Sequence, residues 1–361
     1  MTTPHPRARA RRLLAATIGT LALLAAACGS DEPAGDSGPS ATGGSGATSV
    51  TLYSGRTEDL VQPILDQFRA ATGISVEVKY GDSADLALLI EEEAAADNVR
   101  ADVFLSQSPG SLGFLEQNGR LAELPQSTLD LVPAAVRDDG GKWVGFSGRQ
   151  RVVVYNSDLL SPADLPASVF DLTDPAWKGR IGVAPSNGSF QDFVTAMRVT
   201  EGDDATLAFL EGLDANDPVL YPKNSAIVAA VGRGEVEIGL VNHYYNFRAL
   251  EEDPSLPSAN HQFAPDDPGS TLIITGAAIV DGTDRADVAA QLIDFLLSPT
   301  GQRYFAEETF EYPLAIGQSP ATAIPPIDFG AVGDVGGIAF EDLAGGLEAT
   351  RALIATSGLE S

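Results

Sequence analysis

Two series of alternating strand and helix patterns constrain the fold of this chain more than any other feature. β-branched or alternating runs predict the first strands, and helical repeats lie between them. One of these repeats, residues 57–73, carries apolar residues at helical spacing and ends at Gly73. A second series of the same kind follows Ser147. The predicted strands are 50–53, 74–80, 101–106, 151–156, 180–185 and 236–242. This alternation predicts an α/β fold with right-handed crossovers.

Long strand patterns at 147–156 and 270–280 connect the two series. We expect them to cross between two lobes and to act as hinges. Ligands of such folds bind beyond the carboxyl ends of strands, next to helix N-termini. The expected division is a signal peptide at 1–27, a flexible tether at 28–48, lobe 1 at 49–149 with 275–325, and lobe 2 at 150–274 with 326–361.

The first residues resemble an export signal. Four arginines precede an apolar stretch of about fifteen residues, which is short for a membrane span but typical of a signal peptide. Small residues then precede Cys28, as in the bacterial lipoprotein signal, so we expect Cys28 to be lipidated. The alternative is an ordinary cleavage site beside an incidental cysteine. Cys28 is the only cysteine in the chain, which excludes an internal disulfide and a thiolate metal site.

Charge and histidine content exclude several classes of protein. Without the four arginines of the leader, 18 basic residues face 50 acidic ones, a balance that disfavours nucleic acid and anionic lipid. Only His243 and His261 follow the leader, so a zinc site is not expected. We expect His243 to cap a helix or to lie on the surface. The segment GFSGR (145–149) lacks the final glycine of a nucleophile elbow.

Three predicted strand-to-helix junctions could bind an anion. They are YSGRTED (53–59), APSNGSFQD (184–192) and VNHYYN (241–246). A helix start offers free backbone N–H groups and a favourable dipole to an anion. Ordinary helix capping is the alternative for any one junction taken alone.

The third junction contains two adjacent tyrosines, Tyr244 and Tyr245, in a chain that has eight. Neighbouring side chains point to opposite faces of a strand and diverge by about 100° on a helix. Two adjacent phenols therefore converge only at an irregular junction, where Asn242 is a plausible N-cap. Phenolate is a hard anionic ligand that suits a trivalent cation such as Fe³⁺. The alternative is an aromatic pair that packs between the lobes.

Several segments resemble the ferric-iron-binding periplasmic proteins, which serve ABC importers. They are residues 50–78, 101–115, 147–156, 177–194 and 221–246, in the same order along the chain. The resemblance implies a two-lobed type II periplasmic binding protein fold that closes on its ligand by a hinge. It also implies that Tyr244 and Tyr245 bind Fe³⁺ together with an anion such as carbonate or phosphate.

The resemblance further implies an anion pocket. Its residues are Arg56, Arg149, Asn187, Gly188, Ser189, Asn224 and Asn242. Some members have a histidine where this chain has Thr57 and a glutamate where it has Gln107. A third tyrosine that other members place near the anion loop is also missing. Tyr155, on a crossing strand, is a remaining phenol that we expect to be structural.

Taken together, these features predict an extracytoplasmic lipoprotein receptor for ferric iron with carbonate or phosphate. We expect a monomer that delivers iron to a membrane ABC permease, binds no nucleic acid and is not an enzyme. One alternative is a receptor for an oxyanion or a small organic solute without strong iron binding. A secreted hydrolase is a more distant alternative.

Overall fold

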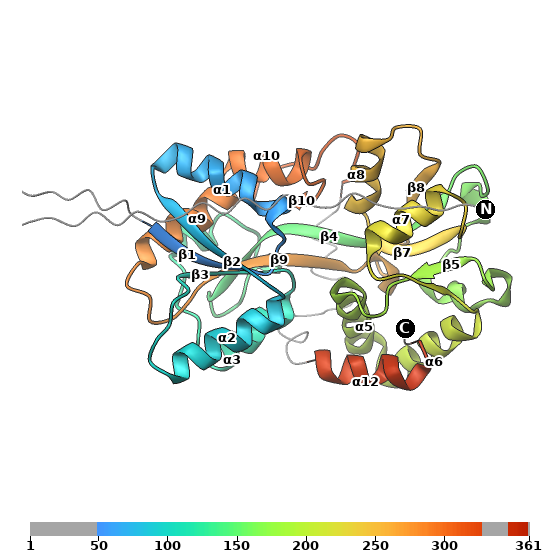
Figure 1. The fold of residues 1–361 in the computed structure, drawn as a ribbon, viewed down its shortest axis with the longest axis horizontal. Helices are drawn as coiled ribbons and strands as arrows, with labels where there is room; N and C mark the ends of the chain where they lie inside the picture. Colours follow the sequence, from blue (N-terminus) through green and yellow to red (C-terminus); the bar gives the residue numbers. More distant parts are fainter. Residues whose placement is uncertain (1–48, 327–345, 360–361) are drawn as a thin grey trace, which may run out of the picture. The chain divides into compact units, whose positions relative to one another are not determined.

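A computed structural model describes residues 49–326 and 346–359 of the chain. The predicted signal peptide, the tether and Cys28 lie outside these residues. Within them a ten-stranded sheet has the order β2-β1-β3-β9-β4-β7-β5-β6, and β8 and β10 each pair with β4. Figure 1 shows helices on both sides of the sheet in each half of this body. The predicted α/β fold is confirmed.

The first α/β series forms as its sequence periodicity predicts. In α1 the apolar residues Leu60, Ile64 and Phe68 share the buried face, and Gly73 ends the helix with φ of 76°. β1 pairs in parallel with both β2 and β3. The elements are β1 (Ser49–Ser54), α1 (Glu58–Thr72), β2 (Ser75–Tyr80), α2 (Ser83–Ala95), β3 (Val103–Ser106), α3 (Pro109–Gln117), α4 (Gln126–Leu129), α9 (Ala286–Leu297), α10 (Pro299–Glu307) and β10 (Tyr312–Pro313).

The second series places three short parallel strands side by side, in the order β7-β5-β6. A helix begins shortly after the carboxyl end of each strand. The elements are β5 (Ile181–Val183), α5 (Gly188–Glu201), α6 (Asp203–Ala215), β6 (Val219–Leu220), α7 (Asn224–Gly232), β7 (Ile238–Asn242), α8 (Tyr244–Glu252), β8 (Ser258–His261) and α12 (Leu347–Ser357). Five short 3-10 helices complete the described residues: 134–136, 162–164, 169–173, 175–177 and 268–270.

Two long strands join the series, β4 (Trp143–Asn156) and β9 (Leu272–Ile279). The first part of β4, up to Gln150, is antiparallel to β9. From Arg151 onward the same strand is antiparallel to β7 instead. β4 therefore belongs to both halves of the sheet, as the predicted crossing strands require.

The buried side chains divide between the two lobes. One cluster contains the apolar residues of β1, β3, β9, α1 and α9. Two smaller clusters surround β5, β7 and the second part of β4, with α5 and α6 on one face and α7 on the other. The fold is thus a two-lobed α/β fold with hinge strands between the lobes. We propose the lobe limits given above, with α12 in lobe 2 because it packs against α5 and α6.

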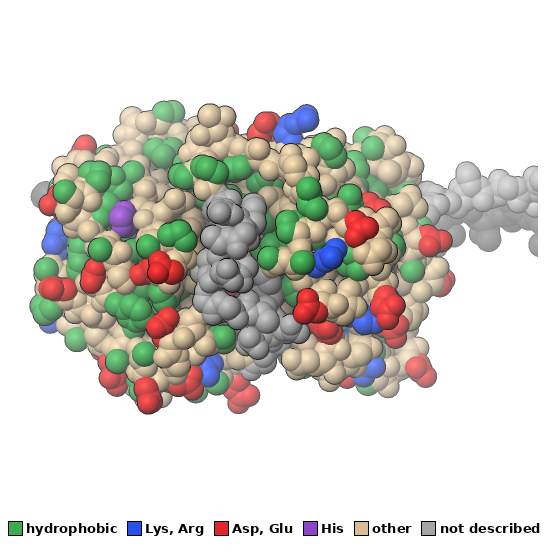
Figure 2. Space-filling model, turned by 180° about the vertical axis from the view of Figure 1, so that it is seen from behind, with side chains coloured by type: hydrophobic (Ala, Val, Ile, Leu, Met, Phe, Trp, Pro, Cys, Tyr) green, Lys and Arg blue, Asp and Glu red, His purple; other side chains and the backbone are tan. Residues whose placement is uncertain are grey.

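Acidic side chains do not mark a site on the face seen in Figure 2, where they are spread over both sides of the molecule. In the described part of the chain, no helix is long and apolar enough to span a membrane.

Candidate functional site

Three helix N-termini of lobe 2 meet beyond the ends of its parallel strands. α5 begins at Gly188 after β5, α7 at Asn224 after β6, and α8 at Tyr244 after β7. Each helix start carries backbone N–H groups without an intrahelical partner and the positive end of the helix dipole. The chain thus concentrates hydrogen-bond donors at this edge of lobe 2.

Polar side chains connect these three helix starts. Asn187 caps α5, and its Oδ1 accepts from the Ser189 backbone N–H at 3.1 Å and from the Ser189 hydroxyl at 2.6 Å. The Asn224 amide donates to Asn187 Oδ1 and to Ser189 Oγ, both at 3.0 Å. The Asn242 backbone N–H donates to Asn224 Oδ1 at 3.1 Å. The structure therefore brings together all five residues of the predicted lobe 2 anion pocket, with Gly188 beside open space.

A fully buried arginine that the sequence analysis did not select, Arg151, supports this cluster. Its guanidinium donates to Asn224 Oδ1 at 3.3 Å, to Asn242 Oδ1 at 3.4 Å and to the Leu240 carbonyl at 2.9 Å. The rings of Phe190 and Phe193 lie 5.6 and 5.5 Å from it. Burial lowers the pKa of Arg151 to about 9, so it remains a cation at neutral pH. It places a positive charge directly behind the two asparagines.

The two tyrosine side chains lie side by side. The rings of Tyr244 and Tyr245 stack with centroids 4.2 Å apart and planes at 29°. Tyr244 is only 2% exposed, and burial, followed by the charge of Tyr245, raises its pKa well above that of an ordinary phenol. Arg56 and Arg149 act in the opposite direction on this pKa. The two phenol rings thus lie face to face, and the charges of Arg56 and Arg149 act on Tyr244.

The structure corrects two predictions at this junction. The N-cap of α8 is His243, without a side-chain capping bond, whereas Asn242 ends β7. His243 holds the N-cap position that was expected of it as one alternative, but its side chain makes no capping bond. It is not a surface residue, because it is 1% exposed and its ring centroid lies 4.6 Å from that of Tyr312. Its Nδ1 accepts from the Gln150 N–H at 3.1 Å, and burial lowers its pKa to about 3. His243 is therefore a neutral core residue.

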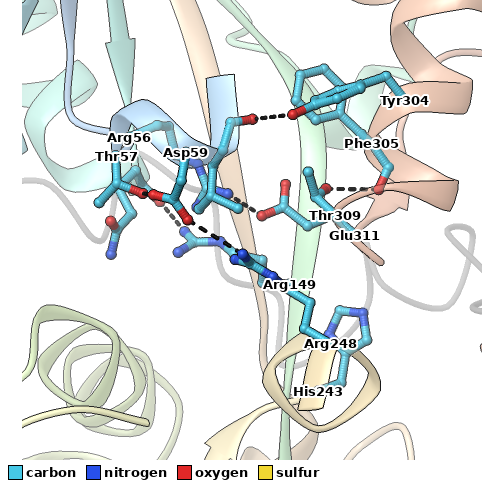
Figure 3. A network of polar contacts seen from close by, with 12 residues as sticks. Arg56, Thr57, Asp59, Arg149, His243, Arg248, Tyr304, Phe305, Thr309 and Glu311 are labelled. Atoms are coloured by element: carbon cyan, nitrogen blue, oxygen red, sulfur yellow. Dashed lines mark hydrogen bonds and ion pairs between the residues drawn. The ribbon is translucent and has the colours of Figure 1, made fainter. Parts of the chain in front are cut away.

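Two arginines from the other side of the site lie near the phenols. Arg56, after β1, forms a buried ion pair with Glu311, and Arg149, on β4, donates to the Gln107 carbonyl oxygen. Figure 3 shows Glu311 facing Arg56, with Arg149 beside them. Burial lowers the pKa of Arg56, but Glu311, Tyr244 and Tyr245 outweigh it and the net pKa is raised. Burial and the charge of Arg56 lower the pKa of Arg149.

The phenols line a cleft of ≈ 510 Å³ between the lobes. Thr57 and Asp59 from lobe 1 and Lys223 and Arg248 from lobe 2 also line it. Arg248 donates to Asp59 at 3.3 Å, which links α8 to α1 across the cleft (Figure 3). Thr57 is exposed, and its hydroxyl donates to Asp59 at 2.5 Å. A ligand held by the tyrosines would therefore contact both lobes.

The structure places the other candidates differently. Gln107 contributes backbone atoms to this region. Its carbonyl oxygen accepts from Arg149, and its N–H donates to Ser83 Oγ at 2.9 Å. Tyr155 packs in an apolar cluster of lobe 2 together with Leu160 and Val169. Within the described ranges no group of three or more His, Cys, Asp or Glu residues could hold a metal ion. Besides the two phenols, the carboxylates of Asp59, Glu252 and Asp253 line the cleft.

The fold and the site agree with a known family. Residues 98–327 match the family model described as bacterial extracellular solute-binding protein. The chain belongs to this family. This solute-binding protein is also 36% identical to the major ferric iron-binding protein of Neisseria meningitidis serogroup A over 274 residues, which are 73% of this chain and 80% of that one.

Two solved structures resemble the solute-binding protein closely. Iron-bound HitA from Pseudomonas aeruginosa has a TM-score of 0.79 and 32% identity, covering 86% of this chain and 99% of its own. The Trichodesmium protein IdiA (FutA), in complex with iron and citrate, has a TM-score of 0.72 and 26% identity, covering 86% of this chain and 100% of its own. The resemblance to ferric-iron-binding periplasmic proteins is confirmed.

Proposed function

We propose that this protein captures ferric iron together with an oxyanion and delivers it to the permease of an ABC importer. One observation carries the proposal: two adjacent phenols stack in the interlobe cleft beside buried arginines and converging helix starts. Phenolates are hard anionic ligands for Fe³⁺. Arg56 and Arg149 oppose the effect of burial on the pKa of Tyr244. Such a site binds and releases its cargo, which fits a transport receptor rather than an enzyme.

The proposed coordination needs an external anion. Two phenolates leave a trivalent ion that prefers six oxygen ligands short of both charge and donors. Carbonate or phosphate would supply the missing oxygens. The anion would accept from the N-terminus of α5 at Gly188, from the Asn242 amide, and from Arg56 and Arg149. Ser189 and Asn224 would join this set by giving up the bonds that their N–H groups donate to Asn187 Oδ1 and Ser189 Oγ. The Asn242 Nδ2 atom supports this role, because it is buried and finds no partner among the described residues.

Replacing Arg149 with alanine should test the anion. We expect ferric binding to weaken about 10- to 100-fold, the range for residues that act beside a metal ligand, and to lose most of its response to added anion. The measurement is an iron titration by visible absorbance, with and without bicarbonate or phosphate.

Arg233→Ala is the matched control, since Arg233 lies exposed at the end of α7 and pairs with Glu235. Tight iron binding that ignores the anion in the wild-type protein would contradict the proposed coordination.

A receptor for an oxyanion alone is the second candidate. It is favoured by three buried arginines, Arg56, Arg149 and Arg151, which would hold an anion without iron. The same titrations separate the two functions. Two results would support this second candidate. Calorimetry would show that iron does not affect the binding of phosphate or bicarbonate, and the protein would stay colourless when iron is added.

We also propose that Cys28 is lipidated and anchors the protein outside the cell membrane, where it acts as a monomer. Wild-type protein should then fractionate with membranes, because a lipid chain adds apolar surface that partitions into the bilayer. Cys28→Ser should release the protein or block its processing, and Ser30→Ala should leave it membrane-bound. Equal partitioning of the wild type and Cys28→Ser would refute the anchor.

A further inference from the structure

Glu311 is a carboxylate inside the site that the proposed coordination does not use. It is 0% exposed and follows α10 in the chain. Its backbone N–H donates to the Phe305 carbonyl at 2.9 Å. The next residue, Tyr312, pairs with Gly148 on β4, beside Arg149. Phe310, just before Glu311, adopts a φ of 57°, which residues other than glycine rarely adopt. The backbone therefore holds this carboxylate against the arginines.

The ion pair between Glu311 and Arg56 joins residues 255 positions apart and is buried on both sides. Each partner keeps unused capacity: Glu311 Oε2 and Arg56 Nε are buried, with no hydrogen-bond partner among the described residues. A guanidinium grips a carboxylate and other oxyanions in the same bidentate way. Glu311 thus presents to Arg56 the group that an external oxyanion would present.

We propose that Glu311 is a built-in counter-ion that competes with the external anion for Arg56 and so sets the anion affinity of the site. The inference rests on the proposed function, since it assigns Arg56 to the anion. Without an anion, Glu311 spares the protein a buried unpaired cation. An incoming anion must displace this carboxylate or tolerate its like charge. Anion binding is therefore weak in the absence of a metal cation that adds its own attraction.

Glu311→Gln tests the competition without requiring iron. Glutamine keeps the shape of glutamate and one oxygen that can accept from Arg56, but it removes the negative charge. We expect inorganic phosphate and bicarbonate to bind the iron-free variant about tenfold or more tightly than the wild type, by calorimetry. Phosphate should also raise the melting temperature of the variant more than that of the wild type. If the role of Glu311 were only structural, the variant would melt at a lower temperature with and without phosphate. Phosphate would then raise the melting temperature of the variant and of the wild type equally.

Glu308→Gln is the matched control, because Glu308 is exposed and lies in the same segment. Equal phosphate affinity of the wild type and folded Glu311→Gln would overturn the proposal. Should Glu311→Gln fail to fold, two further variants decide. In Arg56→Gln the Glu311 carboxylate remains and repels the anion. The double variant Arg56→Gln/Glu311→Gln should therefore bind phosphate more tightly than Arg56→Gln. Equal affinity of the Arg56→Gln and double variants would also overturn it.

These outcomes separate the inference from the proposed function. Failure of the wild type to bind ferric iron would refute the iron receptor, whereas the phosphate comparison is made without iron. Conversely, iron binding with tyrosine-dependent colour, combined with unchanged phosphate affinity in Glu311→Gln, would refute only the role of Glu311.

Discussion

Tyr244→Phe and Tyr245→Phe should each remove the visible colour of the iron-loaded protein and weaken ferric binding by more than about 100-fold. We take 100-fold as the lower limit because mutating a residue that only supports a metal ligand typically costs 10- to 100-fold in affinity. Loss of a ligand itself should cost more. The colour should disappear because, in the proposed coordination, it would arise from charge transfer between phenolate and iron. The measurement is absorbance during an iron titration, with competition against a chelator of known affinity.

Tyr155→Phe is the matched control for this pair. It removes the same hydroxyl from a phenol that packs in the apolar cluster of lobe 2, so colour and affinity should stay at wild-type values. Coloured, tight ferric binding in both Tyr244→Phe and Tyr245→Phe would refute the proposed site. Loss of binding in Tyr155→Phe would instead assign Tyr155 to the coordination.

Ferric affinity should fall by at least about tenfold for each unit of decreasing pH between pH 8 and 5. Burial raises the pKa of Tyr244 well above its ordinary value, so the free protein carries this proton throughout the range. A phenolate ligand must release its proton, and each proton released costs a factor of ten per pH unit. His243 does not contribute, because its pKa of about 3 keeps it neutral.

Proton release can be counted directly with an indicator dye in weak buffer, as iron is added from a chelate at fixed pH. At least one proton per iron should appear. Asp192 needs a control, because burial raises its pKa to about 7 and the charges of Arg149 and Arg151 act on it. Asp192→Asn should keep the slope set by the phenols. A pH-independent affinity, after correction for iron hydrolysis, would exclude phenolate coordination.

Local patterns were enough to predict most elements of the fold. The apolar spacing in α1 and the positive φ at Gly73 are fixed by nearby residues, and so is the junction that holds the two tyrosines. The candidate anion residues of lobe 2 lie at or just after the ends of parallel strands, and these strands end at the same edge.

The missed residues depend on contacts between distant parts of the chain. Arg151 reads locally as part of a strand, and its role follows from asparagines 73 and 91 positions away. One signal was present: Arg149 and Arg151 alternate along β4 and must share a face. The burial of His243 depends on Tyr312, and that of Glu311 on Arg56, neither of which sequence spacing indicates.

The change of partner along β4 also restricts how this protein can vary. Arg149 lies on the part of β4 that pairs with β9, and Arg151 on the part that pairs with β7. One strand therefore fixes the positions of the two arginines relative to each other and to both lobes. Inserting or deleting a single residue between them would turn Arg151 to the opposite face of the sheet. Homologous chains can therefore exchange side chains along this strand, but a change in its length would disrupt the site and the hinge at once.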